Sequence, residues 1–461
     1  MGNTSRREML RNSALAGAGI VAGSVYCPPA VSANSASLTG ESKWDSEYNF
    51  GHTIRFMDEY LQGTLKILGS LGGEIEHIGE LSGRAVSIIK NGGTVYNSAN
   101  IGHMPSTEQS ENRRGNPRVM KDYKKMTASK NKAEMLEASF DDLKKGDMII
   151  TCYCNKSLRE ARDRGVYVVS VPVNYVNNEF WPDGYVLPNE DNLMLKDVSN
   201  EILHSYIPYE QGLVHPPEIP YMAICPSCTT SLGALYWMLS AEIANRLADP
   251  KAVKNDMSAE YLDILTGRVR RIKAHRDHIR ETAVEMTRRV LDGGRWFVRS
   301  SEHTGLASEL ERVASGPWMP NTGDWNARKT RNIMLISAIS PSFPEEIKIA
   351  LEKQVEGAFV IGIGPASLDG SLPSGRLIDI ADAGFDNFSP ESGGIISING
   401  RKDTICPASG IMSNIIQQMI CAQWADEMAR RGSVPYFLMG NYRKGRIFNP
   451  LLQPSAEKRG Y

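Results

Sequence analysis

Two short blocks, 181 residues apart, constrain the fold more than any other feature of the sequence. Ile224–Ser227 reads Ile-Cys-Pro-Ser and Ile405–Ala408 reads Ile-Cys-Pro-Ala, and an apolar, helix-like stretch follows each block. Other blocks recur in the same order, namely Gly92-Gly93 with Gly293-Gly294, Met148–Thr151 with Met334–Ser337, Gly165 with Gly357, and Ser205–Pro208 with Asn387–Pro390. Collinear repetition of this kind predicts an internal duplication with differing loop lengths.

Strand-like and helix-like segments alternate within each half. Helical patterns run over 53–90 and 258–291, and each ends at a Gly-Gly pair, a typical helix stop. Runs such as Met148–Thr151 and Phe359–Ile363 are continuously apolar, as strands buried on both faces are. The alternation predicts an α/β protein with two tandem doubly wound parallel-sheet domains, each a three-layer αβα sandwich, that together form a pseudo-dimer. The expected boundaries are 44–250 and 255–445, with a C-terminal tail over 446–461.

The first 33 residues have the pattern of an export signal. Arg6-Arg7 precedes a mildly apolar run over 14–25, and Val31-Ser32-Ala33 offers small residues for cleavage. A paired arginine before an Ala/Gly-rich run is typical of twin-arginine signals. The alternative is an accidental Arg-Arg pair ahead of an amphipathic N-terminus. We therefore expect a signal peptide over 1–33 and an exported protein of the periplasm or cell envelope.

Charge and hydropathy exclude two classes of partner. The 461 residues carry a formal net charge of −1, so no basic field predicts nucleic-acid binding. After the N-terminus no stretch of 18 apolar residues occurs, so we expect no membrane span in the mature chain. We also expect no cofactor.

The second half resembles the sugar isomerase (SIS) family, especially an uncharacterised bacterial branch and the phosphoheptose isomerase group. The resemblance rests on the segment from Gly293-Gly294 to Glu309-Leu310, on Asp386-Asn387-Phe388, and on Cys406–Ser409 before an apolar helix. It covers 258–445 and, through the repeat, 52–248. It implies a flavodoxin-like fold of the SIS type and a sugar or sugar phosphate as ligand.

The resemblance places the ligand at the carboxyl ends of the strands, as the general rule for open α/β sheets also does. Serine-rich loops at helix starts bind phosphate through backbone N–H groups and hydroxyls. The alternative for such serines is helix capping, and Ser342 with Glu345 makes a capping box. The substrate-binding candidates are Ser337, Ser340, Ser342 and Ser409 in the second half, and Thr151, Asn155, Ser157 and Thr229 in the first.

Proton transfer on a sugar needs a carboxylate base and an acid partner. Glu309 falls where the family has its catalytic glutamate, and Glu108 occupies the corresponding place in the first half. His303 and His103, on the loops after the first strands, are candidate proton shuttles. The alternatives are solvated glutamates in a first helical turn and loop histidines bound to backbone. The last helix carries Gln417-Gln418 where phosphoheptose isomerases have a histidine, so that group's mechanism does not transfer.

The cysteines open a different hypothesis. Cys152 and Cys154 are expected on one face of one strand, and Cys225 and Cys228 form a C-x-x-C at a helix start, where a thiolate would be stabilised. These four thiols could hold zinc or form a disulfide. The alternative is that they are small buried side chains.

The sequence thus favours binding of a carbohydrate derivative, with a sugar isomerase or lyase-like enzyme that uses Glu309 as base. A non-catalytic exported carbohydrate-binding protein and a Cys-based metal or redox protein are the alternatives. Which sugar is bound, whether it is phosphorylated, whether the protein is catalytic and whether it forms a homo-oligomer are left open.

Overall fold

The computed structural model describes residues 55–99, 109–123, 139–173, 178–180, 192–252, 256–300, 309–310, 315–339, 344–366, 375–390, 393–440 and 443–461. All of them belong to one compact unit, Phe50–Tyr461. The predicted signal peptide, 1–33, lies outside the described residues. The predicted domain boundaries, 44–250 and 255–445, stay a prediction.

Each half begins with the same helical arrangement. Helix α4 (Arg55–Leu71) and helix α5 (Ile75–Lys90) are joined by a 3₁₀ turn at Gly72–Glu74. In the second half, α9 (Asp256–Arg271) and α10 (Arg276–Leu291) are joined by a 3₁₀ turn at Ile272–His275. The two helical patterns expected from the sequence are therefore confirmed, and each is two helices in succession.

The first half contains a five-stranded parallel sheet in the order β2-β1-β3-β4-β5. Its central strand β3 is buried along its whole length, as its apolar run predicts. The register pairs Val95 with Met148 and Met148 with Tyr167. The strands are β1 (Val95–Ser98), β2 (Lys121–Asp122), β3 (Met148–Thr151), β4 (Tyr167–Ser170) and β5 (Glu201–Ile202).

The second half contains a four-stranded parallel sheet in the order β11-β10-β9-β8. Strands β9 and β10 form its buried centre, and Ile333 pairs with both Trp296 and Phe359. The strands are β8 (Trp296–Ser300), β9 (Ile333–Ser337), β10 (Phe359–Gly364) and β11 (Ala383–Asp386). The predicted α/β class with parallel sheets is therefore confirmed.

Shorter elements complete the structure. An antiparallel pair, β6 (Gly212–Val214) and β7 (Ile224–Pro226), leads into α8. The other helices are α6 (Lys156–Asp163), α7 (Leu195–Val198), the 3₁₀ segment η4 (Trp325–Arg331), α11 (Pro344–Val355), α12 (Leu377–Ile380) and α14 (Arg443–Arg459). The predicted tail, 446–461, is thus mostly the helix α14. Among the described residues, no helix combines the length and apolar character needed to cross a membrane.

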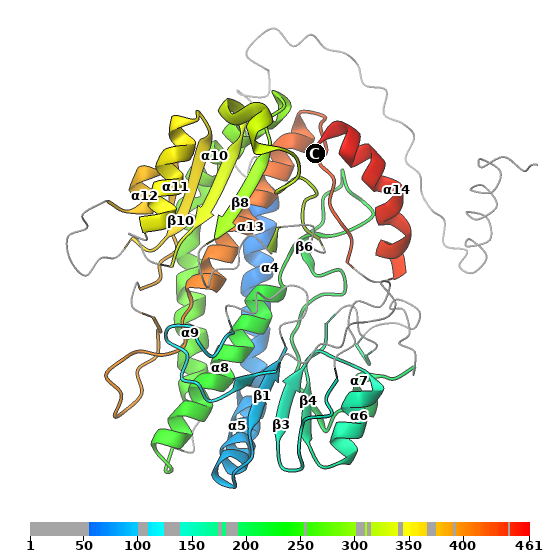
Figure 1. Cartoon of the computed structure of the whole chain (residues 1–461), viewed down its shortest axis with the longest axis vertical. Coiled ribbons are helices and arrows are strands. Elements are labelled where there is room, and N and C mark those ends of the chain that lie inside the picture. The colour runs from blue at the N-terminus through cyan, green and yellow to red at the C-terminus, as the bar shows by residue number, and fades with distance from the viewer. Residues whose placement is uncertain are drawn as a thin grey trace, which may run out of the picture. The chain divides into compact units, whose positions relative to one another are not determined.

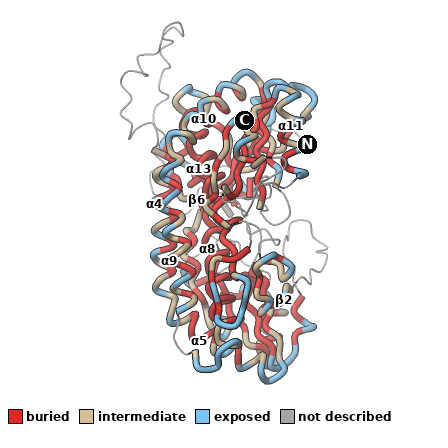
Figure 2. The backbone as a smooth tube through the Cα atoms, turned by 90° about the vertical axis from the view of Figure 1, so that its left-hand side faces the viewer, coloured by how far each residue is buried: buried red, intermediate tan, exposed pale blue. Residues whose placement is uncertain are grey.

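Two long helices lie at the centre of the core. Helix α8 (Cys228–Ala248) is buried from Cys228 to Ala244, and α13 (Ser409–Arg430) is buried from Ser409 to Met428. Figure 2 shows both as mainly red, buried stretches of the backbone. A surface helix would be apolar on one face only, so these two are interior elements on which the others pack.

The first helix of each half packs on the last long helix of the other half. Helix α4 packs along α13, as Figure 1 also shows, and α9 packs along α8. The second helices stay within their own halves, because α5 packs on α8 and α10 packs on α13. Helices far apart in the sequence therefore form one continuous core.

Several backbone details occur at matching places in the two halves. The Cys225 and Cys406 residues before the long helices have φ of 62° and 59°. The Tyr60 hydroxyl donates to the Pro226 carbonyl over 3.2 Å, and the Tyr261 hydroxyl donates to the Pro407 carbonyl over 3.1 Å. A duplication would produce such pairs, but the duplication itself remains a prediction of the sequence.

Candidate functional site

Glu309 is a buried acid that belongs to the second half by sequence and contacts the first half in space. Glu309 is 1% exposed, and its backbone carbonyl accepts a hydrogen bond from Gln418 Nε2 of α13 over 3.4 Å. Its side chain lies near the Thr229 hydroxyl at the start of α8. The structure therefore brings together two predicted site residues, Glu309 and Thr229, from different halves.

Burial raises the pKa of the Glu309 carboxyl to about 8, and the Thr229 hydroxyl lowers it only in part. Neither carboxyl oxygen has a hydrogen-bond partner of ordinary geometry among the described residues. Burying an ionised carboxylate without such partners is costly, so the group keeps its proton at neutral pH. Shifts of this size are typical of functional sites.

Hydroxyl and thiol groups surround this acid. Tyr60 of α4 is fully buried, and burial, followed by Cys225 and Glu309 among its neighbours, raises its pKa. The hydroxyls of Thr64 and Thr230 lie beside Tyr60 and are themselves buried. We call this set the Glu309 cluster: Glu309, Tyr60, Thr64, Thr229 and Thr230.

The Glu309 cluster has more polar atoms than it satisfies internally. Among the described residues, Thr64 Oγ1 and Thr230 Oγ1 are buried without a hydrogen bond of ordinary geometry, although both lie beside the Tyr60 hydroxyl, and the same is true of both Glu309 carboxyl oxygens. Buried polar groups in folded proteins are nearly always hydrogen-bonded to protein or to ordered water. The cluster therefore leaves hydrogen-bonding positions for ordered water or another polar partner.

Ser409 lies at a different place, the start of α13. Arg113, buried and from the loop after β1, donates to Ser409 Oγ over 2.5 Å. Ser409 and Gln418 are nine residues apart on one helix, hence about 13 Å along its axis. Ser409 and the contact between Glu309 and Gln418 therefore lie at separate parts of α13.

The other described serine and threonine candidates lie at strand ends or in capping roles. Ser337 and Thr151 are the last residues of β9 and β3, and both are buried. Asn155 caps α6 by accepting from the Leu158 N–H over 2.9 Å. Ser157 Oγ accepts from the Phe140 N–H over 2.8 Å, so it is engaged in the fold.

Five predicted residues lie outside the described part of the chain. They are His103, Glu108, His303, Ser340 and Ser342. Their proposed roles stay predictions.

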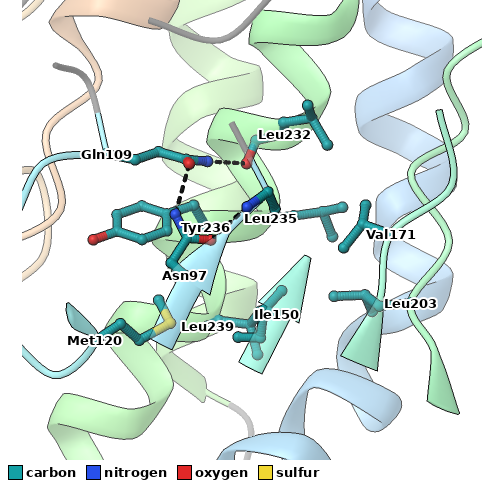
Figure 3. A pocket seen from close by; sticks show the side chains of 11 residues that line it. Asn97, Gln109, Met120, Ile150, Val171, Leu203, Leu232, Leu235, Tyr236 and Leu239 are labelled. Carbon is teal, nitrogen blue, oxygen red and sulfur yellow. Dashed lines mark hydrogen bonds between the residues drawn. The ribbon is translucent and has the colours of Figure 1, made fainter. Parts of the chain in front are cut away.

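A small, mainly apolar hollow of about 10 Å³, with room for about one water molecule, lies between the first sheet and α8 (Figure 3). Gln109 accepts from Asn97 Nδ2 over 2.8 Å and donates to the Leu232 carbonyl over 3.3 Å, so its amide is held in place. Burial raises the pKa of Tyr236, the only titratable residue in the lining. The lining residues are Asn97, Ala99, Gln109, Met120, Ile150, Val171, Leu203, Leu232, Leu235, Tyr236 and Leu239. Because this lining is mostly aliphatic, the hollow is better explained as a small packing defect of the core than as a site for acid–base chemistry.

The expected placement of the cysteines on one strand requires correction. Strand β3 ends at Thr151, so Cys152 and Cys154 lie in the loop that follows rather than on one strand face. No set of three or more His, Cys, Asp or Glu residues in the described ranges could hold a metal ion. The thiols at the C-x-x-C are not activated either, because burial raises the pKa of both Cys225 and Cys228.

Sequence analysis missed Tyr60, Thr64 and Thr230. They lie in apolar helices, where buried side chains are usually read as core. One signal was available for Tyr60, because Tyr261 occupies the same distance from the Gly-Gly pair in the second half.

No family model matches the sequence, and no curated protein matches it. Solved structures with a similar arrangement include a "Putative sugar binding protein" from Salmonella typhimurium LT2, 13% identical, which aligns over 80% of this chain and 99% of its own with a TM-score of 0.43. A "putative phosphosugar isomerase" from Clostridium difficile is 12% identical over 86% of this chain and 98% of its own, with a TM-score of 0.44. The C-terminal domain of glucosamine-fructose-6-phosphate aminotransferase from Francisella tularensis is 9% identical over 84% and 98%, with a TM-score of 0.42.

Proposed function

We propose that the protein binds a sugar or sugar phosphate at the Glu309 cluster and moves a proton on it, as an isomerase-like or lyase-like enzyme. The observation that carries the proposal is the buried Glu309 carboxyl, whose pKa is raised to about 8 and whose oxygens have no hydrogen bond of ordinary geometry among the described residues. The hydroxyls of Tyr60, Thr64, Thr229 and Thr230 suit the oxygen atoms of a sugar.

The proposed step is a proton transfer next to a carbonyl. The ionised Glu309 carboxylate takes the proton from the hydroxyl-bearing carbon beside the carbonyl. The C–H electron pair forms a C=C bond and the carbonyl π pair moves onto its oxygen, which gives an enediolate. The hydroxyl proton passes to that oxygen, and the neutral Glu309 carboxyl returns its proton to the former carbonyl carbon as the new carbonyl forms. In the lyase variant, the electron pair instead expels a leaving group from the next carbon.

The pKa sets the pH dependence of this step. With a pKa of about 8, roughly one-tenth of the Glu309 carboxyls are ionised at pH 7. The rate of proton abstraction should therefore rise about tenfold per pH unit below pH 8 and level off above it. A rate that is flat between pH 6 and pH 8 would contradict Glu309 as the base.

The experiment is incorporation of solvent deuterium. The full chain is incubated in D₂O with a panel of aldoses, ketoses, amino sugars and their phosphates, and deuterium at the carbon beside the carbonyl is read by mass spectrometry. An enediol mechanism exchanges this hydrogen even where net conversion is small. Glu309→Gln should abolish the exchange.

Glu427→Gln is the matched control. Glu427 is also a buried glutamate with a raised pKa, caused mainly by burial, but Arg430 and Gln423 are its neighbours rather than the Glu309 cluster. It should retain exchange. Binding of a sugar without exchange in the parent would favour the carbohydrate-binding protein, and neither binding nor exchange would refute the proposal.

A further inference from the structure

A second hollow lies at the opposite edge of the second sheet from Glu309. Gly293 and Gly294 line it just before β8, Arg328 lines it before β9, and residues 458–461 line it at the end of α14 and just beyond. The hollow measures about 330 Å³ and is open to solvent. Glu309, in contrast, follows the carboxyl end of β8.

Four cations line this hollow. They are Arg295, Arg328, Lys458 and Arg459, and Asp324 is the only carboxylate side chain among the lining residues. None of the four forms an ion pair with a side-chain carboxylate in the chain as described, whereas nearby Arg288 and Arg289 both pair with Glu285. Asp324 instead caps η4 by accepting from the Asn326 N–H over 2.9 Å. Positive side-chain charge is therefore concentrated at this hollow, although Arg459 also lies over the Tyr436 and Tyr461 rings.

Glycines let the backbone approach the guanidinium groups of Arg295 and Arg328 closely. A Cβ on Gly293 would overlap the Arg328 guanidinium, and a Cβ on Gly460 would overlap that of Arg295. Arg295 also donates to the Gly460 carbonyl. Both glycines have left-handed φ, 86° and 85°, which other residues rarely adopt. The two guanidiniums are thus held in place before any ligand arrives.

Holding two guanidiniums together has an electrostatic cost. Burial, and then the charge of Arg328, lower the pKa of Arg295. An anion between them would remove the repulsion and accept several charge-assisted hydrogen bonds, which arginine provides in a fork that matches phosphate and carboxylate oxygens. The size is within the range of small-molecule sites.

We propose that this hollow binds a phosphorylated small molecule with at least two negative charges. It is a second site, separate from the Glu309 cluster, and it does not depend on the function proposed there. Arg295 and Arg328 contact the phosphate oxygens, and Lys458 and Arg459 supply further positive charge from the end of α14.

The test is calorimetric titration of the full chain with inorganic pyrophosphate. The parent should bind, and Arg328→Gln should weaken binding by about tenfold or more, since it removes a charge-assisted contact. Arg331→Gln is the matched control, because Arg331 is also exposed and also donates to the Asp292 carbonyl, but does not line the hollow. Arg331→Gln should change the affinity for pyrophosphate by no more than about twofold, because its charge is more distant and is screened.

Two results would overturn the proposal. One is absence of pyrophosphate binding by the parent at millimolar concentration, and the other is an equal loss in Arg328→Gln and Arg331→Gln. If Arg328→Gln fails to fold, Lys458→Gln on the exposed end of α14 replaces it and should also weaken binding. Glu309→Gln should bind pyrophosphate as the parent does, so failure of the sugar proposal leaves this one separately testable.

Discussion

Replacing Glu309 by glutamine should change how the stability of the protein depends on pH. The folded protein holds this carboxyl with a pKa raised from 4.5 to about 8 by burial. The unfolded chain ionises it near 4.5, so its stabilising contribution is fully present below that pH and is lost as the pH rises to about 8. Glutamine has nearly the same shape and does not ionise.

The magnitude follows from linkage. Between pH 5 and pH 8 a carboxyl with these two pKa values loses about 3.5 kcal/mol of its contribution to the free energy of unfolding. The free energy of unfolding of Glu309→Gln, minus that of the parent, should therefore increase by about 3.5 kcal/mol over this range. Other titrating groups are common to both proteins and cancel in the difference.

Urea unfolding followed by tryptophan fluorescence, with both proteins at pH 5 and pH 8, measures this quantity. Glu427→Gln serves again as the control for replacing a buried glutamate by glutamine. A difference between Glu309→Gln and the parent that stays constant with pH would mean that Glu309 is ionised and solvated in the folded protein. That result would refute the reasoning about the site.

Two further perturbations test the framework around the site. Gly294→Ala would place a Cβ against the main-chain carbonyl of Arg331, just before β9, so its free energy of unfolding in urea should fall by about 3 kcal/mol. Gly267→Ala, on α9 with open space around it, is the control and should raise the free energy of unfolding by roughly 0.5–1 kcal/mol. His77 bridges Glu74 and Glu201, over 3.3 and 3.0 Å, and the hydrogen bond to Glu74 is the main cause of its raised pKa. The protonated His77 stabilises the fold at low pH, and this stabilisation is lost as the pH rises through the folded pKa of His77. His77→Gln should therefore lower the free energy of unfolding more at pH 5 than at pH 8. An equal loss at both pH values would contradict the ion pairs.

The sequence predicted those parts of the fold that depend on local pattern. The helices over 55–90 and 256–291 were predictable because their periodicity and the Gly-Gly stops are properties of neighbouring residues. The buried strands β3 and β10 were predictable for the same reason. Helix α14 was not, because Pro450 and Pro454 lie inside it and proline normally argues against a helix interior.

The site was only half predictable. The resemblance to the SIS family singled out Glu309 as a candidate, but its neighbours come from elsewhere: Thr229 lies 80 residues earlier and Tyr60 earlier still. Local pattern carries no information on such contacts, since they depend on which helices pack together. The cysteines were misplaced for the same reason. Their proximity was inferred from the expected strand ends, whereas their burial depends on which helices and strands pack together.

The packing of α4 on α13 has a consequence for folding during synthesis. Helix α4 also packs on β6, α8 and α9, but its most extensive partner is α13, which is complete only when residue 430 has left the ribosome. Until then part of its apolar face, which includes Phe56, Met57 and Leu68, remains exposed or is shielded by another protein. The closing contact also spans a very long loop, and such contacts form slowly. A nascent chain truncated before α13 should therefore be a client of chaperones rather than a folded half.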